Sequence, residues 1–311
     1  MPYIPTECKF GFLTDTHFSV VRNNFRTDSF FDSVISKFSQ CYDHFNATGC
    51  EFIVHGGDMF DKYRSYSHPM ILKIREVIVN SKIPTYFIWG QHDLLGYNRD
   101  SSRNSNLEFL KEICDGKLKE LNDHVDTGFL HLYASHVDQD PAEVFQKINH
   151  KRSFKPSVVV AHALLYNTHS NFGTIDIYKF DNIKPTLILS GDLHSGFEAT
   201  KVGNTTFYNP GSLARTEKTD RKPKCAVITL KPFLTEWTVN IEEFFPKCED
   251  YPFPEETVEL KVSDQQDSDE YIEAFEKFKS ESKDIIEHLE KVGEHHKIDR
   301  EILEYIKSKR K

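Results

Sequence analysis

Short apolar runs recur along the chain and predict the strands of a sheet-rich fold. They cover residues 9–13, 52–55, 85–89, 129–134, 157–161, 186–190, 205–208, 225–230 and 237–241. The runs at 157–161 and 186–190 are continuously apolar at their centres rather than alternating with polar residues. This pattern is typical of strands buried on both faces, so these two are predicted to lie inside a sheet.

Segments between the runs have the apolar spacing of helices. Residues 29–45 place apolar side chains about every 3.6 residues, at Phe30, Phe31, Val34, Ile35, Phe38, Tyr42 and Phe45. Residues 69–80 form a second predicted helix, opened by Pro69, and weaker helical patterns cover 106–114 and 141–148. Strands alternate with helices early in the chain and follow one another closely after Thr186, which predicts a two-sheet α/β sandwich.

The composition of the chain changes near Glu242. Residues 1–243 are predicted to form one domain, and the proline-rich stretch 244–256 is predicted to be a linker. A short strand at 257–262 and a charged, amphipathic helical stretch at 269–310 would follow. Residues 257–311 therefore predict a small C-terminal appendage of one strand plus helices.

Charge and cysteine content narrow the class of protein. The net charge of −9 counts against a protein that coats nucleic acid with a basic surface. It does not exclude a nuclease, because metals and a few local cations can hold phosphate. The 6 cysteines include no CxxC pair, which predicts reduced thiols in a cytoplasmic protein. We expect no signal peptide and no membrane span, since no apolar run approaches the length of either.

Potential metal ligands follow five of the predicted strands. They are Asp15 and His17, Asp58, the run Gln91-His92-Asp93, His162, and Asp192 with His194. Each alone has an ordinary explanation as a turn residue or a buried structural histidine. Together they lie at strand ends, where open α/β sheets place their sites. The set holds only oxygen and nitrogen donors, which suits Mn²⁺, Mg²⁺, iron or zinc, and it is large enough for two ions.

The order of these motifs is specific to one superfamily. The succession DxH, GGDxxD, GxHD, H and GxxH, followed by NPGS at 209–212, resembles the calcineurin-like metallophosphoesterase superfamily. The segments HGGDMFD and NPGSLAR look most like those of SbcD-type double-strand-break repair nucleases, including phage recombination endonuclease subunits. The resemblance covers roughly 9–215. It implies the two-sheet sandwich of that superfamily and two divalent metal ions, Mn²⁺ first and Mg²⁺ as the alternative.

The resemblance also assigns roles to residues. It implies that Asp15, His17 and His194 hold the first metal, that Asp58 bridges both metals, and that Gln91, His162 and Asp192 complete the second site. His92 would be the general acid, oriented by Asp93, and Asp61 would support the Asp58 loop.

Two positions depart from the superfamily pattern. The superfamily usually has Asn in place of Gln91 and His in place of Asp192. Both residues present here offer oxygen donors in the second site. The site is therefore either retuned toward a harder cation such as Mn²⁺ or Mg²⁺, or weakened.

Basic residues cluster on the loops that would form the site. They are Lys62, Arg64, Arg99, Arg103, Arg215, Lys218, Arg221, Lys222 and Lys224. In an acidic chain this clustering predicts a track for a DNA backbone, with solvated turns as the alternative for any one cluster. The resemblance implies an SbcC-type, SMC-like ATPase as partner for the helical tail. Homodimerisation, or packing of the tail on its own core, is the alternative.

The sequence thus predicts a metal-dependent DNA exo/endonuclease subunit of an SbcCD-like recombination and repair complex. It would hydrolyse phosphodiesters by a two-metal mechanism with His92 as general acid, in the cytoplasm, or in the host cytoplasm if a phage encodes it. Two alternatives stay open. One is a small-molecule phosphodiesterase or phosphatase of the same superfamily. The other is a non-catalytic scaffold with a weakened second metal site.

Overall fold

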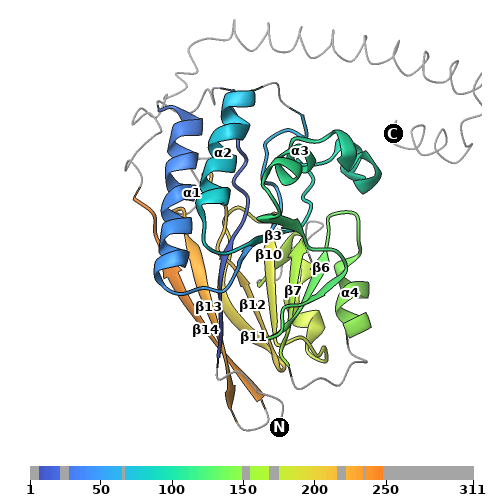
Figure 1. The fold of residues 1–311 in the computed structure, drawn as a ribbon. Helices are drawn as coiled ribbons and strands as arrows, with labels where there is room; N and C mark the ends of the chain where they lie inside the picture. The colour runs from blue at the N-terminus through green and yellow to red at the C-terminus, as the bar shows by residue number, and fades with distance from the viewer. Residues whose placement is uncertain are drawn as a thin grey trace, which may run out of the picture. The chain divides into compact units, whose positions relative to one another are not determined.

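Two six-stranded mixed sheets pack face to face, and helices cover their outer faces (Figure 1). The computed structural model describes residues 7–21, 28–64, 67–148, 155–167, 175–215, 222–233 and 236–247. The two-sheet α/β sandwich predicted from the sequence is confirmed.

The first sheet has the strand order β14-β13-β1-β2-β3-β4. Its strands are β1 (Cys8–Leu13), β2 (Ile53–His55), β3 (Thr85–Phe87), β4 (Leu118–Glu120), β13 (Cys225–Phe233) and β14 (Glu236–Phe244). Strands β1 to β4 run parallel, whereas β13 is antiparallel to both β1 and β14. The carboxyl ends of β1, β2 and β3 therefore point to the same edge of the sheet.

The second sheet has the order β11-β12-β10-β7-β6-β5. Its strands are β5 (His124–Asp126), β6 (His131–Ser135), β7 (Ser157–His162), β10 (Leu187–Gly191), β11 (Phe197–Val202) and β12 (Thr205–Asn209). The four central strands run parallel and the two edge strands are antiparallel to their neighbours. A separate ribbon pairs β8 (Leu165–Tyr166) with β9 (Ile175–Asp176). The continuously apolar strands β7 and β10 lie side by side inside this sheet, as predicted.

The helices begin where the sequence provides caps. They are α1 (Phe30–Ala47), α2 (His68–Asn80), α3 (Asn106–Ile113) and α4 (Pro141–Lys147), with the 3₁₀ turns η1 (Leu95–Tyr97), η2 (Arg99–Asn104) and η4 (Ile177–Phe180). The side chains of Ser67, Ser105 and Asp140 accept hydrogen bonds from the first turns of α2, α3 and α4. Such caps satisfy backbone N–H groups that have no partner within the helix.

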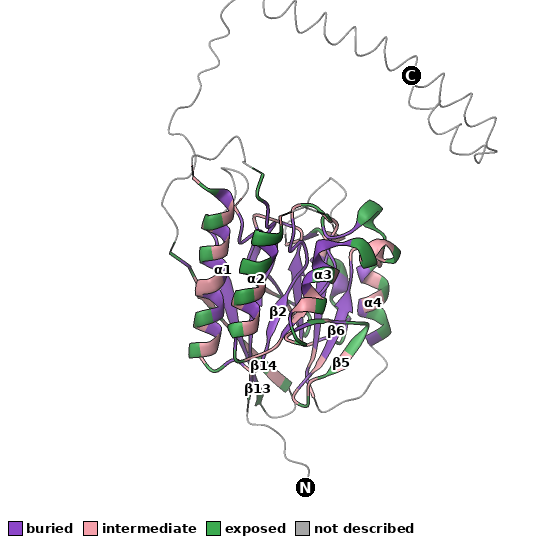
Figure 2. Cartoon of the chain, turned by 45° about the horizontal axis from the view of Figure 1, so that its top comes forward, coloured by how far each residue is buried: buried purple, intermediate pink, exposed green. Residues whose placement is uncertain are grey.

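Three apolar layers hold the sandwich together. Phe12, Val54 and Val160 belong to the layer between the two sheets. Helices α1, α2 and α3 pack on the outer face of the first sheet, and α4 with η4 packs on the outer face of the second. Figure 2 shows the consequence, because α1 and α2 are buried on the side toward the sheet and exposed on the other. The layers make a rigid frame for the loops at the strand ends.

The nine strands and four helices predicted within residues 1–243 are present, with ends shifted by a few residues, whereas the strand predicted at 257–262 and the helical stretch at 269–310 lie outside the described residues. Strands β4, β5, β8, β9 and β11 were not predicted. Within the described residues no helix is long and apolar enough to cross a bilayer. Residues 248–311 lie outside the described part of the chain. The domain limits, the linker at 244–256, the appendage at 257–311 and its ATPase or homodimer partner therefore stay predictions.

Candidate metal centre

The five ligand-bearing strand ends meet at one edge of the sandwich. The end of β1 is joined to the end of β2 by a hydrogen bond from Gly56 N to Leu13 O at 2.9 Å, and Asp15 N bonds Gly57 O at 3.1 Å. The second sheet joins them through His162, whose Nδ1 donates to Gly56 O at 2.7 Å. Residues far apart in the sequence are thereby brought into one centre.

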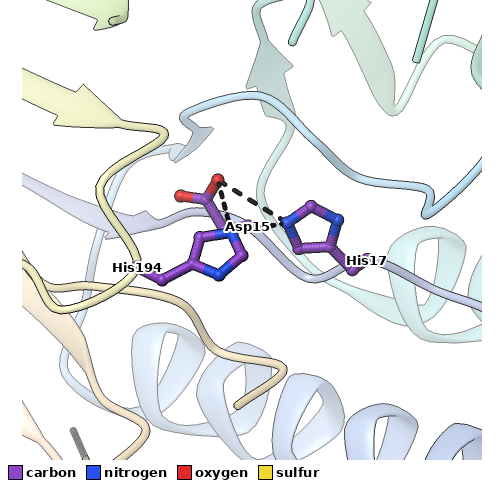
Figure 3. A group of neighbouring side chains, drawn as sticks. All are labelled: Asp15, His17 and His194. Atoms are coloured by element: carbon purple, nitrogen blue, oxygen red, sulfur yellow. Dashed lines mark hydrogen bonds and ion pairs between the residues drawn. The ribbon is translucent and has the colours of Figure 1, made fainter. Parts of the chain in front are cut away.

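Asp15, His17 and His194 form the first group of ligand atoms (Figure 3). The two Nε2 atoms of His17 and His194 lie 3.0 Å apart. They are 3.9 Å and 4.0 Å from Asp15 Oδ1, respectively. All three atoms can thus reach one cation, and their role as ligands of the first metal stays a prediction.

Asp58 lies between this group and a second one. Its Oδ2 is 3.9 Å from His17 Nε2 and 3.3 Å from His162 Nε2, while its Oδ1 accepts from His92 N at 2.8 Å. One carboxylate oxygen therefore faces both groups, which is the position predicted for a bridging ligand.

Buried atoms without hydrogen-bond partners test whether the centre fits metal ions. Asp58 Oδ2, His162 Nε2 and Gln91 Oε1 are buried and have no hydrogen-bond partner. Such atoms are rare in folded proteins because leaving them unpaired is costly. Asp58 Oδ2 and His162 Nε2 lie 3.3 Å apart, and all three atoms are of a kind that binds metals, so the residues present fit a divalent cation.

The backbone at the ligands adopts an uncommon conformation. The φ angles of Asp15, His17, Asp58 and Asp192 are 52°, 42°, 51° and 78°. A positive φ at a residue other than glycine costs about 1–3 kcal/mol and is found mainly at functional sites. Gly57 has a φ of 97°, and a Cβ there would overlap the His162 ring. The surrounding fold therefore holds these ligand-bearing loops in a strained conformation.

Burial changes the acid–base behaviour of the centre. It raises the pKa of Asp15 to about 6, helped by nearby Asp58, and it lowers the pKa of His17 to about 3. A neutral His17 keeps a lone pair available for a metal. Burial opposes ionisation of Asp58, but the adjacent His162 outweighs it and lowers the pKa of Asp58.

His92 is exposed and stands beside this buried group. Its Nδ1 is 2.8 Å from the carbonyl oxygen of Asp61, which can only accept, so Nδ1 carries the hydrogen. Ligand atoms of His17, Asp61 and His92 also come within 4.8 Å of one another. Nε2 of His92 is thus left available to act as an acid or as a ligand.

The prediction that Asp93 orients His92 is wrong. The buried Asp93 carboxylate instead accepts hydrogen bonds from the backbone N–H groups of Met59, Phe60 and Gly90, at 3.3, 3.0 and 3.2 Å. Asp93 therefore fixes the loop that carries Asp58. The carbonyl group of Asp61 takes the orienting role, so Asp61 does support the site, but through its backbone.

Two supporting side chains were not predicted. His55, buried at the end of β2, accepts from Gly57 N at 3.3 Å, and its Nε2 is 3.1 Å from Thr16 Oγ1. Ser212 Oγ donates to Asp15 O at 2.9 Å and so attaches the NPGS segment to the first ligand. The sequence signal for His55 was a polar residue closing an apolar strand directly before Gly56.

The predicted DNA-binding residues differ in their exposure and in their partners. Lys62, Arg64, Arg103 and Lys222 are exposed. Arg99 is engaged with Asp138 at 2.9 Å, Arg215 is half-buried, and Lys218 and Arg221 lie outside the described residues.

The prediction for Lys224 is wrong. It is only 4% exposed and pairs with Glu198 and Glu243. Its charge is neutralised inside the fold, so Lys224 is a structural residue.

Comparison with solved structures finds distantly similar proteins. A dimetal phosphatase from Danio rerio is 9% identical, with 78% of this chain and 99% of that chain covered and a TM-score of 0.50. The purple acid phosphatase PPD1 from yellow lupin (Lupinus luteus) is 12% identical, with 78% and 53% covered and a TM-score of 0.49. Vps29 from Chaetomium thermophilum is 11% identical, with 77% and 100% covered and a TM-score of 0.35. At 9% identity, the likeness to the dimetal phosphatase shows the fold alone.

The family comparison is more specific. Comparison with curated protein sequences gave no match. The family profile of the calcineurin-like phosphoesterases matches residues 8–196, which is more than half of the chain and spans every strand end described above. The chain therefore belongs to the calcineurin-like phosphoesterase family, which suggests metal-dependent hydrolysis of phosphoesters.

Proposed function

We propose that this protein is a two-metal phosphodiester hydrolase that cleaves DNA. The observation that carries the hydrolase part is Asp58 Oδ2, which is buried, has no hydrogen-bond partner and faces both ligand groups. A shared carboxylate of this kind holds two ions close together.

The roles of the residues follow from their positions. When bound, two divalent ions neutralise phosphate charge and lower the pKa of a water nucleophile. Asp15, His17, His194 and Asp58 would hold the first ion, and Asp58, His162 and Gln91 the second. Exposed His92, with its Nδ1 hydrogen on Asp61 O, would deliver a proton from Nε2 to the departing sugar oxygen.

The choice of DNA rests on the surface next to His92. Asp61, which orients His92, is followed by exposed Lys62, and Arg64 Nε donates to Asn104 O at 3.3 Å. That bond places Arg64 beside exposed Arg103. A cluster of positive charges next to the general acid His92 suits a substrate with several phosphates better than a single small ester. We name Lys62, Arg64 and Arg103 the basic patch.

The test compares three substrates in one buffer containing Mn²⁺. Purified full-length protein is incubated with end-labelled duplex DNA, an aryl phosphodiester and an aryl phosphomonoester. We expect cleavage of DNA, loss of that cleavage in Asp58→Ala, and no loss in Asp43→Ala. The control removes an exposed carboxylate on α1.

The other results have distinct meanings. Cleavage of the small esters without DNA cleavage would reject the DNA substrate and favour the small-molecule hydrolase. No cleavage of any substrate by protein that binds Mn²⁺, with Mg²⁺ tried as well, would favour the scaffold.

A further inference from the structure

A hydrogen bond between two side chains crosses the metal centre. Gln91 Nε2 donates to Asp192 Oδ1 at 2.6 Å. Gln91 follows β3 of the first sheet and Asp192 follows β10 of the second, and the two residues are 101 positions apart. The bond therefore ties together the two sheets at the edge where the ligands meet.

The chemistry of the pair fixes the direction of the Gln91 amide. An ionised carboxylate only accepts hydrogen bonds, so the amide nitrogen must face Asp192 and the oxygen must face away from it. Gln91 Oε1 is buried and has no hydrogen-bond partner, like Asp58 Oδ2 and His162 Nε2. The amide oxygen is thus presented as a ligand atom.

Hydrogen bonds fix the backbone on both sides of Gln91 and at Asp192. His92 N donates to Asp58 Oδ1 at 2.8 Å and Gly90 N donates to Asp93 Oδ2 at 3.2 Å, which holds the loop on either side of Gln91. Asp192 N lies 3.2 Å from each carboxylate oxygen of Asp15. The torsions of the long Gln91 side chain are what remain free, and the bond to Asp192 restricts them.

We propose that Asp192 is a positioning residue for the second metal and not one of its ligands. It holds the Gln91 amide so that Gln91 Oε1, Asp58 Oδ2 and His162 Nε2 form the protein part of the second site. This differs from the sequence-based ligand set, in which Asp192 itself bound the metal. The inference rests on the two-metal part of the proposed function and is independent of the DNA substrate.

The donor set has a consequence for the metal. Two oxygen atoms and one imidazole nitrogen suit Mn²⁺ or Mg²⁺. The first group offers the imidazoles of His17 and His194 beside its carboxylates. The second site therefore has the same number of oxygen donors as the first but one imidazole fewer.

The test measures Mn²⁺ binding to the full chain, by electron paramagnetic resonance and calorimetric titration, in four variants. Asp192→Asn keeps an oxygen that accepts from Gln91, so we expect second-site affinity within about fivefold of wild type. Asp192→Ala and Gln91→Ala should each weaken the second Mn²⁺ by about 10–100-fold and leave the first unchanged. The double variant should bind no more weakly than Gln91→Ala alone, because Asp192 acts through Gln91.

Several results would overturn the inference. If Asp192→Asn is as harmful as Asp192→Ala, or if Asp192→Ala adds its full effect to Gln91→Ala, then Asp192 is an independent ligand. If wild-type protein binds fewer than two Mn²⁺ ions, this inference and the two-metal proposal both fail. If two ions bind with the expected pattern and DNA is not cleaved, only the DNA substrate is rejected.

Discussion

The floor and the rim of the metal centre are built in different ways. The floor consists of Asp15, His17, Asp58 and His162, each at most 3% exposed. The rim consists of Gln91, His92, Asp192 and His194, which are half-buried or exposed. Asp15, His17 and Asp58 sit on loops fixed by backbone contacts and have a positive φ, and His162 is the last residue of β7. In the rim, by contrast, Gln91 is positioned mainly by its side-chain bond to Asp192.

The difference in burial assigns metal binding mainly to the floor and contact with substrate and solvent to the rim. The floor brings carboxylates and imidazoles together without water, which is unfavourable until a cation joins them. The rim can contact a substrate and exchange protons, because its side chains reach solvent. Changes in the floor should therefore alter stability and the binding of both metals. In the rim, a change of His92 should alter turnover alone, whereas changes of Gln91, Asp192 or His194 should weaken the binding of one metal.

The largest effect is expected for His92→Asn, which breaks the rim alone. Removing a general acid should lower the rate of DNA cleavage by about 10²–10⁴-fold, while both Mn²⁺ ions stay bound. Cleavage rates and Mn²⁺ titrations on the same preparation check this. Loss of one Mn²⁺ ion would show that His92 is a ligand, and unchanged cleavage would remove it from the mechanism.

A substitution in the floor should act through stability. The φ of Gly57 is 97°, and an added Cβ would overlap the His162 ring, so Gly57→Ala combines backbone strain with a clash. We expect a loss of about 2–4 kcal/mol in the free energy of unfolding, with weaker Mn²⁺ binding.

Gly128→Ala is the matched control for this change. Its φ is 91°, and an added Cβ there has nothing within 4 Å. It should cost only the backbone strain, about 1–2 kcal/mol. Equal losses in the two variants, measured by urea unfolding, would show that the contact with His162 does not constrain the floor.

Metal removal tests the floor without a mutation. Mn²⁺ at about 100 times its dissociation constant should stabilise the protein by about 2.7 kcal/mol for each ion bound, relative to protein in chelator. The gain is expected because the cation replaces the missing partners of Asp58 Oδ2 and His162 Nε2. Urea unfolding with and without Mn²⁺ measures it. The same gain in Asp58→Ala would mean that Mn²⁺ stabilises the protein from another site.

Most of the floor could be predicted from the sequence, and the reason is physical. Parallel strands bring their carboxyl ends to one edge, so a polar residue after each apolar run predicts a shared site without knowledge of the loops. Asp15, His17, Asp58 and His162 were found in this way. The short strands β4, β8 and β9 were missed, because two or three residues carry no readable periodicity.

Contacts between distant parts of the chain explain the errors. Lys224 follows a cluster of basic residues, yet it pairs with Glu198 and Glu243, which only the folded sheet brings near. Asp93 is adjacent to His92 in sequence, yet its carboxylate turns to the backbone of Met59 and Phe60. In both cases the adjacent residues in the sequence suggested the wrong partner, DNA for Lys224 and His92 for Asp93.

The smallest effect is expected from substitutions in the basic patch. Lys62→Ala and Arg64→Ala each remove one exposed positive charge beside the acid, where a DNA backbone would pass. Each should weaken DNA binding a few-fold and lower the salt dependence of binding by about one phosphate contact, while the turnover number and Mn²⁺ binding stay unchanged. Lys82→Ala is the control, because Lys82 is equally exposed but precedes β3 and so lies at the opposite end of that strand. Binding is measured by fluorescence anisotropy at several salt concentrations. If Lys82→Ala changes the salt dependence as much as Lys62→Ala does, the attraction comes from the overall charge of the protein, and the basic patch does not bind the DNA backbone specifically.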